Sequence, residues 1–286
     1  MKEAFRKMKN LGYYNGIIDE PEKIMIPMND RACWFGDGVY DACLARNYKI
    51  FALEDHLNRL FRNAAWLELE PPMTRDELKN LLDDLMHKMD EGELFVYIQL
   101  TRATGPRKHI YTHGPSNLWI TVKPLKFSDD VSLKVITCED DRWMHNDVKS
   151  INLISAVRTS EKAHRAGCEE AILVRPGGIV TECSHSNVHI LKNGTLITHP
   201  ADNMILPGIA RKHLLAMCQT LGIPVNERAF TLDELMDADE IIITSTSKLC
   251  LSVSEIDGKP VGLKDRDTFH RIREALVDEF LQETDK

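Results

Sequence analysis

A polar stretch at residues 123–130 divides this chain into two halves with different hydrophobic patterns. Before it, two helical patterns precede two β-rich runs, and after it short apolar strands alternate with helices. A length of 286 residues allows one large domain or two modest ones, because domains usually contain about 100–200 residues. We therefore predict an α+β fold with a small N-terminal domain over residues 1–125 and a larger C-terminal domain over residues 126–286.

Local signals in the first half predict its helices. Apolar residues recur at helical spacing from Leu53 onward, and two prolines at residues 71–72 are expected to end this helix. Thr74 and Glu77 have the spacing of a capping box, which predicts a second helix that Gly92 ends. The expected strands of this half are residues 94–101 and 118–122, with a Gly-, Pro- and His-rich loop at residues 105–115 between them.

The second half is predicted to contain short apolar strands, two helices and a hairpin turn at residues 257–258. Its expected strands are residues 133–138, 170–174, 179–182, 188–191, 195–198 and 240–244, and its expected helices are residues 209–221 and 268–282. The sequence contains no internal repeat and no low-complexity segment.

Composition excludes several classes of function. The chain has 36 Lys and Arg against 44 Asp and Glu, a net charge of −8 that lacks the basic face of a nucleic-acid-binding protein. No segment approaches the about 20 consecutive apolar residues of a membrane helix, and the first residues lack the apolar run of a secretory signal. Seven scattered cysteines without a Cys-x-x-Cys pair indicate reduced thiols and no metal site. We expect a soluble cytoplasmic protein that binds neither nucleic acid nor a membrane, and the acidic charge does not exclude a small anionic ligand.

Two residues have the chemistry needed to bind a positively charged cofactor. Lys149 lies in a mixed polar and apolar segment, where partial burial would lower its pKa and make it a Schiff-base nucleophile. Glu182 ends an expected strand, where a carboxylate could pair with a protonated ring nitrogen. Taken alone, each residue fits an ordinary solvent-facing side chain better than a catalytic one.

Other residues could bind anions. Gly208 stands where a helix begins, Ser245 and Thr246 follow an apolar strand, and Arg59 on the first helix adds a positive charge for a phosphate. Arg107 and His109 share one loop, and an arginine can hold a carboxylate in two parallel bonds. The plain alternatives are caps, turns and solvated basic side chains. No P-loop occurs, and the glycines near residue 36 lack the third glycine of a dinucleotide fingerprint.

The order of these motifs resembles that of the class IV, or fold type IV, aminotransferases, which use pyridoxal 5′-phosphate. Residues 35–40 resemble the N-terminal signature of that family, and residues 147–150 resemble its cofactor-lysine segment. Its longest signature, Glu-x-small-x-x-Asn, Leu-x-Thr and Leu-x-Gly-Ile-x-Arg, matches residues 182–187, 196–198 and 206–211. The resemblance covers nearly the whole chain and implies a two-domain fold type IV aminotransferase, D-amino acid aminotransferase-like, whose C-terminal domain carries the cofactor lysine.

Within the family, the chain most resembles the branch that acts on D-amino acids. The segments that carry this likeness are residues 142–143, 150–153 and 199–206, and Tyr40, Arg107 and His109 match the substrate-carboxylate trap of that branch. The resemblance implies transamination between a D-amino acid such as D-alanine and a 2-oxo acid such as 2-oxoglutarate. A branched-chain L-amino acid aminotransferase or an aminodeoxychorismate lyase of the same fold is the closest alternative, and a non-catalytic ligand-binding protein is a further one.

The resemblance also implies a role for each matching residue. Lys149 and Glu182 would be catalytic, the first bound to the cofactor as a Schiff base and the second holding the ring nitrogen protonated. The residues that would bind pyridoxal phosphate are Lys149, Arg59, Glu182, Ile209, Ser245 and Thr246, and those that would bind substrate are Tyr40, Arg107 and His109. Members of the family work as homodimers, so the resemblance implies a homodimer.

The chain departs from the family pattern at several positions. The departures are His185 for serine, His189 for phenylalanine or tyrosine, Ala210 for threonine, Asp41 for glutamate, and His145-Asn146 for Arg-Cys. They bear on pocket size, substrate range and phosphate affinity, whereas the lysine and the glutamate are intact.

Overall fold

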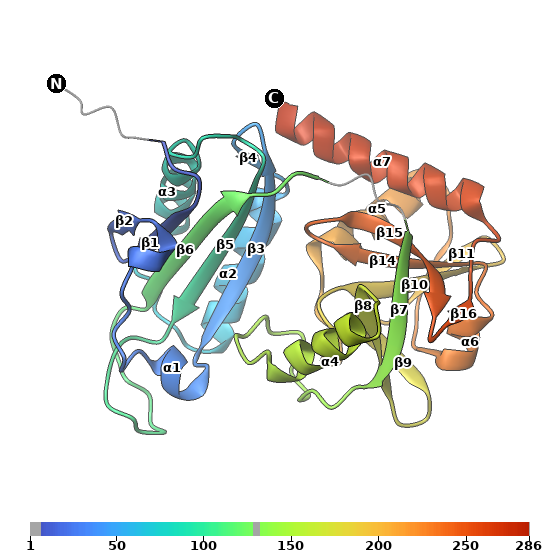
Figure 1. Ribbon diagram of the computed structural model, residues 1–286, viewed down its shortest axis with the longest axis horizontal. Coiled ribbons are helices and arrows are strands. Elements are labelled where there is room, and N and C mark those ends of the chain that lie inside the picture. The colour runs from blue at the N-terminus through green and yellow to red at the C-terminus, as the bar shows by residue number, and fades with distance from the viewer. Residues whose placement is uncertain (1–6, 128–131, 286) are drawn as a thin grey trace. The chain divides into compact units, whose positions relative to one another are not determined.

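The computed structural model describes residues 7–127 and 132–285. The first six residues of the expected N-terminal segment, and Ser128, Asp129 and Asp130 of the expected linker, lie outside the described residues. The chain divides into two compact units, each with helices and strands, which confirms the α+β prediction (Figure 1). Unit 1 comprises Met1–Phe127, Val148–Asn152 and Leu281–Lys286, and unit 2 comprises Ser128–Asp147 and Leu153–Phe280.

Unit 1 contains a six-stranded sheet in the order β2-β1-β6-β5-β3-β4. Its strands are β1 (Leu11–Tyr14), β2 (Ile17–Asp19), β3 (Gly38–Arg46), β4 (Lys49–Ile50), β5 (Leu94–Thr101) and β6 (Asn117–Pro124). Its helices are η1 (Pro21–Lys23), α1 (Arg31–Phe35), α2 (Leu53–Trp66) and α3 (Arg75–Met86). Leu57 and Leu60 of α2 and Leu82 of α3 share one buried core with β3, β5 and β6, so both helices pack on the sheet (Figure 1).

The helix boundaries follow local chemistry closely. Thr74 and Glu77 form the expected capping box, with the Glu77 carboxylate accepting from the Thr74 amide at 2.7 Å. Helix α2 ends at Trp66, several residues before the prolines at 71–72. The reason is that Glu68 adopts a left-handed conformation, which turns the buried Leu69 into the core.

A segment from the middle of the chain completes unit 1. Residues 148–152 form an antiparallel bridge with β3, in which the Tyr40 amide donates to the Lys149 carbonyl at 3.0 Å. Val148 is buried in the core of the same unit. Lys149 therefore belongs to unit 1, whereas the sequence analysis placed it in the C-terminal domain. The difference arises because this pairing joins residues more than a hundred positions apart, which leaves no local pattern.

Unit 2 contains a larger sheet in the order β12-β11-β10-β14-β15-β7-β8-β9-β13, with β16 paired to β15. Its strands are β7 (Ser132–Glu139), β8 (Glu170–Arg175), β9 (Ile179–Cys183), β10 (Asn187–Lys192), β11 (Thr195–Thr198), β12 (Val225–Glu227), β13 (Phe230–Thr231), β14 (Glu240–Ser245), β15 (Leu249–Ile256) and β16 (Lys259–Pro260). Its helices are α4 (Ile154–Arg165), α5 (Ile209–Thr220), α6 (Leu232–Met236) and α7 (Arg266–Asp285), of which the last five residues belong to unit 1.

Both faces of this sheet are covered. Ile241 and Ile243 of β14 lie in a core that includes Leu235 of α6, whereas Ile242 lies in a core with Leu214 of α5. Successive strand residues point to opposite faces, so a strand buried on both sides reads as an unbroken apolar run. This explains why residues 240–244 were recognisable as a strand.

The structure describes the state of the cysteines and the length and polarity of the helices. All seven cysteines are free thiols, and burial raises the pKa of both Cys218 and Cys250 to about 12. Within residues 7–127 and 132–285, no helix is both long enough and apolar enough to cross a membrane.

The burial of Val148 predicts a measurable contribution to stability. Val148→Ala removes two methylene equivalents from the unit 1 core, and we expect the free energy of unfolding to fall by about 1–3 kcal/mol. The control is Val157→Ala on α4, where the side chain is 58% exposed and the expected change stays within about 0.5 kcal/mol. Urea titration followed by circular dichroism measures both, and equal effects would contradict the assignment of Val148 to the core.

Candidate active site

The predicted site residues divide between the two units. Unit 1 carries Lys149, Tyr40, Arg107, His109 and Arg59, and unit 2 carries Glu182, Ile209, Ser245 and Thr246.

In unit 1, Lys149 lies on an aromatic platform. Its Nζ is 4.4 Å from the ring centroid of Tyr40, which attracts an ammonium group electrostatically. The Tyr40 ring stacks on Tyr97 with centroids 5.3 Å apart, and the Tyr97 hydroxyl donates to Gln99 at 2.6 Å. Because β3 and β5 are paired along their length, the platform holds the half-buried amine over a rigid surface.

Arg59 is buried beside a carboxylate. Its Nε and Nη2 donate to Asp41 at 2.8 and 2.7 Å, and Nδ1 of His56 lies 2.7 Å from the same carboxylate. Burial by itself would raise the pKa of Asp41, but Arg59 and His56 outweigh it and hold that pKa well below its usual range. Asp41, one of the departures from the family pattern, therefore fixes the guanidinium predicted to bind phosphate.

Asp41 and His56, together with Cys43, are also close enough to one another to hold a metal ion. The donor set does not fit one. Burial raises the pKa of the Cys43 thiol well above its usual value, and Asp41 is already paired with the Arg59 cation.

Arg107 and His109 converge on one aromatic ring. The Arg107 guanidinium carbon is 5.4 Å from the Phe35 ring centroid, and the His109 ring centroid is 5.3 Å from the same ring. Both side chains are exposed, so their donors are available to a ligand. The structure brings these two residues together, as predicted.

A buried ion-pair cluster holds the loop that carries them. Arg31 Nη1 donates to the carbonyls of Lys108 and Ile110 at 2.7 and 3.3 Å. Asp37, from the N-terminal signature, accepts from Nε of Arg31 at 2.8 Å and from Nε of Arg102 at 3.0 Å. The aspartate between the two glycines of that signature thus anchors the arginine that holds the loop.

In unit 2, Glu182 is buried and does not face water. Its Oε2 accepts from the Asn187 side chain at 2.9 Å and from the Leu206 amide at 3.0 Å, and its Oε1 accepts from Arg142. A buried carboxylate with these donors stays ionised, which a partner for a cationic ring nitrogen must do.

The beginning of α5 lies beside the same residues. Asn187 also donates to the Leu206 carbonyl at 2.9 Å, and a Cβ added to Gly208 would meet the Asn187 amide oxygen at 2.1 Å. Among the described residues, no side chain caps α5, and its first turn has no acidic residue. The first-turn amides, including that of Ile209, thus form a site suited to an anion.

Ser245 ends β14 and Thr246 follows it, at the end of the strand where Asn187 lies. Asn187 of β10 pairs with Thr244 of β14, so the turn at residues 246–248 leaves the sheet near the Asn187 position. Both side chains are half-buried. Unit 2 therefore brings the predicted phosphate residues Ile209, Ser245 and Thr246 to one region, near the residues that hold Glu182.

Comparison with known proteins gives the family. A family model described as amino-transferase class IV matches residues 38–256. The D-alanine aminotransferase of Bacillus licheniformis is 36% identical over 279 residues, covering 96% of this chain and 98% of that protein. The chain belongs to the class IV aminotransferases. The D-alanine aminotransferase of Listeria monocytogenes serotype 4b is 37% identical over 94% of this chain and 95% of that protein.

Solved structures of class IV aminotransferases share the fold. The branched-chain amino acid aminotransferase of Escherichia coli has a TM-score of 0.87 at 21% identity, covering 97% of this chain and 96% of that one. The branched-chain aminotransferase of Thermoproteus uzoniensis has a TM-score of 0.83 at 23% identity, covering 95% and 97%. The fold type IV assignment is confirmed.

One departure from the class IV pattern, His189, is a buried cross-link. Its ring nitrogens lie 2.8 Å from the Thr198 hydroxyl and 2.9 Å from the Thr244 hydroxyl, on the two strands that flank β10. Burial, with a contribution from Arg211, lowers the pKa of His189 well below its usual value. The residue is therefore a neutral structural bridge between strands.

Two further departures, His185 and Asn146, also bind neighbouring groups, and Ala210 is buried. His185 pairs through Nδ1 with the buried carboxylate of Glu170, which also accepts from the Ser186 hydroxyl at 2.7 Å. Asn146 donates to the carbonyls of Trp143 and Met204 at 3.0 and 3.2 Å. Ala210 lies buried in the first turn of α5 without a hydroxyl.

Three residues that matter to this site received no role from the sequence. Arg142 and Asn187 bind the Glu182 carboxylate directly, and His56 binds the partner of Arg59. Asn187 closes the Glu-x-small-x-x-Asn motif, so its fixed spacing from Glu182 was a usable signal. Arg142 and His56 act across strands and helices, which sequence spacing does not show.

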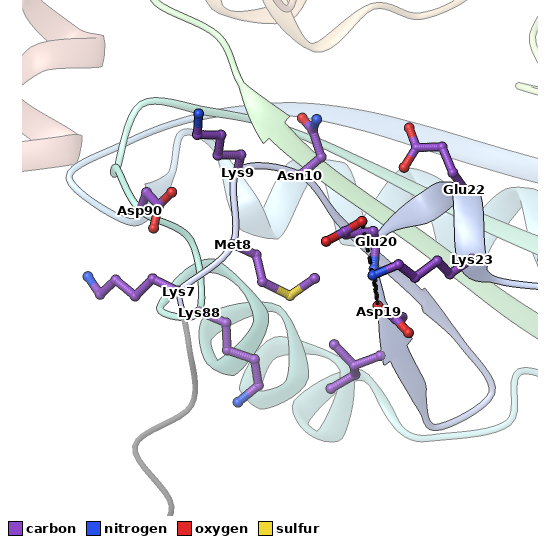
Figure 2. A pocket seen from close by; sticks show the side chains of 11 residues that line it. Lys7, Met8, Lys9, Asn10, Asp19, Glu20, Glu22, Lys23, Lys88 and Asp90 are labelled. Carbon is purple, nitrogen blue, oxygen red and sulfur yellow. Dashed lines mark hydrogen bonds and ion pairs between the residues drawn. The ribbon is translucent and has the colours of Figure 1, made fainter.

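A surface pocket of about 790 Å³ lies elsewhere on unit 1. Figure 2 shows two mixed groups of charge around it, with Asp90 beside Lys7 and Lys9 and with Lys23 beside Glu20 and Asp19. Lys23 in the lining pairs with Glu20 at 3.1 Å, and both side chains are more than half exposed. None of the predicted site residues lines this pocket.

The buried His189 predicts a pH dependence of stability. Its folded pKa is depressed, so below about pH 6.5 the unfolded chain binds a proton that the folded chain does not, and stability falls as the pH falls. We expect His189→Phe to remove about 1 kcal/mol per pH unit of this loss between pH 6.5 and 4.5. The control is the exposed His113→Phe. Urea titrations across this range give the slopes, and an unchanged slope in His189→Phe would show that this histidine is protonated in the fold.

Proposed function

We propose that this class IV aminotransferase transfers the amino group of a D-amino acid, such as D-alanine, to a 2-oxo acid, such as 2-oxoglutarate. The observation that carries the proposal is the pair of exposed donors, Arg107 and His109, which both contact the Phe35 ring. Their loop is held by the hydrogen bond from Arg31 to the Lys108 carbonyl. The D-alanine aminotransferases of Bacillus and Listeria, which match nearly the whole chain, support the same reaction.

As a class IV aminotransferase, the chain uses pyridoxal 5′-phosphate, and the residues present fit that group. The chain has a half-buried amine at Lys149, a buried carboxylate at Glu182 and the uncapped start of α5, which are the kinds of group that this cofactor needs. When bound, the cofactor accepts the amino group and takes up the electron pair released from the Cα–H bond of the substrate. Arg59, Ile209, Ser245 and Thr246 are the proposed partners of its phosphate.

The two catalytic residues act on protons at defined atoms. Nζ of Lys149 would hold the cofactor covalently and, as a free amine, would move the proton from the substrate Cα to the C4′ carbon of the cofactor. Glu182 holds the proton on the ring nitrogen, because the ionised carboxylate stabilises a cation beside it. The Asn187 and Leu206 donors keep that carboxylate in place.

The carboxylate of the substrate determines which enantiomer reacts. Arg107, His109 and the Tyr40 hydroxyl are the proposed donors to that carboxylate. With the carboxylate fixed on one side, only one enantiomer directs its Cα hydrogen toward the lysine amine. Stereochemistry therefore follows from the position of these donors.

We further propose that the protein is a cytoplasmic homodimer. Free thiols at all seven cysteines are consistent with a reducing compartment. Unit 1 exposes large apolar side chains, with Met25 82%, Met28 77% and Ile110 79% exposed, which a second copy of the chain would cover.

The enantiomer test decides the proposed function. Purified protein with pyridoxal phosphate and 2-oxoglutarate should form pyruvate from D-alanine. It should transfer no amino group from L-leucine, and it should not act on aminodeoxychorismate. Lys149→Ala should lose the visible absorption of the bound cofactor and nearly all turnover, because no other amine replaces Nζ. Product formation is measured by coupled assay and chromatography. Turnover of L-leucine without D-alanine would replace the proposal with a branched-chain activity.

Arg107→Ala should raise the KM for D-alanine about 10- to 100-fold, because it removes a charge-assisted hydrogen bond of about 1.5–3 kcal/mol. The dissociation constant of the cofactor should stay near the wild-type value. Lys108→Ala, an equally exposed cation on the same loop, is the matched control and should leave both constants unchanged. Steady-state kinetics and cofactor titration measure them. An unchanged KM in Arg107→Ala would remove this arginine from the substrate site.

A further inference from the structure

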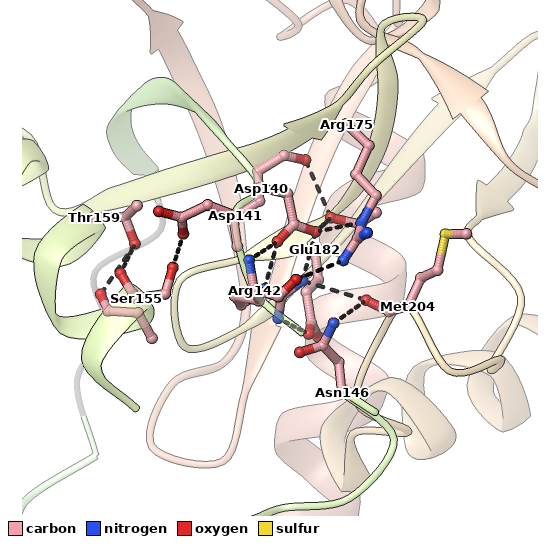
Figure 3. A network of polar contacts seen from close by, with 12 residues as sticks. Asp140, Asp141, Arg142, Asn146, Ser155, Thr159, Arg175, Glu182 and Met204 are labelled. Carbon is pink, nitrogen blue, oxygen red and sulfur yellow. Dashed lines mark hydrogen bonds and ion pairs between the residues drawn. The ribbon is translucent and has the colours of Figure 1, made fainter. Parts of the chain in front are cut away.

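Glu182 is one member of a network of four charged side chains within unit 2. Figure 3 shows Asp140, Arg142, Arg175 and Glu182 in contact. All are largely buried, with side-chain exposures of 0% for Asp140, 12% for Arg142, 16% for Arg175 and 6% for Glu182. Two carboxylates and two guanidiniums thus balance each other where water screens charge weakly.

Strand order brings these residues together. Asp140 follows the end of β7, Arg175 ends β8, and Glu182 lies near the end of β9. Strands β7 and β8 are parallel, and β8 and β9 are antiparallel. The Asp140 amide donates to the Val174 carbonyl at 2.9 Å, which continues the β7–β8 pairing beyond the end of β7.

Arg142 divides its hydrogen bonds between the two carboxylates. Its Nε and Nη2 donate to Asp140 at 2.9 and 3.0 Å, and its Nη1 donates to Glu182. Burial by itself would lower the pKa of Arg142, but Asp140 and Glu182 together raise it. The guanidinium therefore stays charged, and its single positive charge is shared between the two carboxylates, so it neutralises neither of them fully.

Three further donors fix the position of Asp140, of which one is the backbone amide of Arg142 at 3.2 Å. Arg175 Nε lies 3.1 Å from the Asp140 carboxylate, and the Thr181 hydroxyl donates at 2.8 Å. Burial by itself would raise the pKa of Asp140, but the bonds from Arg142 and the other donors lower it. Asp140 is therefore ionised and held at both carboxylate oxygens. Its link to Glu182 in the network runs through Arg142, which binds both carboxylates.

We propose that Asp140 is a positioning residue for Glu182, because it binds two donors of Arg142 and so limits how far that guanidinium neutralises the Glu182 carboxylate. The inference rests on the proposed function, in which Glu182 holds the proton of a cationic ring nitrogen. Through Arg142, Asp140 determines how much negative charge Glu182 presents to that nitrogen. Arg175 weakens this effect, because it pairs with Asp140 and neutralises part of its charge.

The sign of each effect follows from charge. Removing the negative charge of Asp140 leaves Arg142 free to bind Glu182 more fully, so a ring nitrogen beside Glu182 holds its proton less tightly. Removing the positive charge of Arg175 leaves Asp140 more negative, so Asp140 binds Arg142 more strongly and Arg142 neutralises Glu182 less. The ring nitrogen then holds its proton more tightly. Damage to the fold would shift both variants in the same direction, whereas the proposal requires opposite shifts.

The experiment compares Asp140→Asn and Arg175→Gln with a matched control, Asp141→Asn. Asp141 is the next residue and is 46% exposed. It accepts from the Ser155 hydroxyl (Figure 3) and pairs with Arg158. Each protein is reconstituted with pyridoxal phosphate labelled with ¹⁵N in the ring, and the ¹⁵N signal is followed against pH. The cofactor dissociation constant and the KM and kcat for D-alanine are measured in parallel.

We expect the ring-nitrogen pKa to fall by about one unit in Asp140→Asn, to rise in Arg175→Gln, and to match the wild type in Asp141→Asn. In Asp140→Asn, kcat should fall several-fold more than KM changes. Equal pKa values in Asp140→Asn and Asp141→Asn would overturn the inference while leaving the proposed function intact. A wild-type protein that fails to bind the cofactor would overturn both. If Asp140→Asn does not fold, the less buried Arg175→Gln decides, and an unchanged or lowered pKa there would overturn the inference.

Discussion

Backbone pairing between residues 148–152 and β3 is the constraint on which the position of the Lys149 amine, the proposed catalytic group, depends. The lysine itself is long and flexible, but its main chain is hydrogen-bonded to Tyr40 and its neighbour Val148 is buried in the unit 1 core. Both ends of the side chain are thus defined, one by the sheet and the other by the aromatic ring beneath the amine. A loop alone would leave the amine to sample many rotamers, at a cost of roughly 1.5–2 kcal/mol when ordered.

Buried carboxylates shared between cations occur in both units. Asp41 is shared between Arg59 and His56, and Asp140 is shared between Arg142 and Arg175. In each case a buried acid fixes an arginine: Asp41 fixes Arg59, which the sequence predicts to bind phosphate, and Asp140 fixes Arg142, which binds Glu182. Such pairs contribute little net stability, because desolvation offsets their attraction, so their value lies in fixing geometry.

Much of the fold was predictable from local patterns, and the rest depends on long-range pairing. Strands β5 and β11 were predicted at their observed bounds, because apolar runs with turn residues at each end are local signals. Helix α4 was not predicted, since among its residues only Thr159 and Ala163 are buried and its apolar pattern is weak. The candidate site residues were named from motif order. The contacts of Arg142 and His56 could not be, because they join separate strands and helices.

The close approach of Gly208 to Asn187 has an evolutionary consequence. The amide that holds Glu182 and the first turn of α5 meet with no room for a methyl group between them. A relative with a larger residue at position 208 must have a shorter or displaced side chain at position 187. Where position 187 carries a smaller residue, the contact that requires glycine at position 208 is absent. The two positions should thus vary as a pair among relatives, even though twenty residues separate them in the sequence.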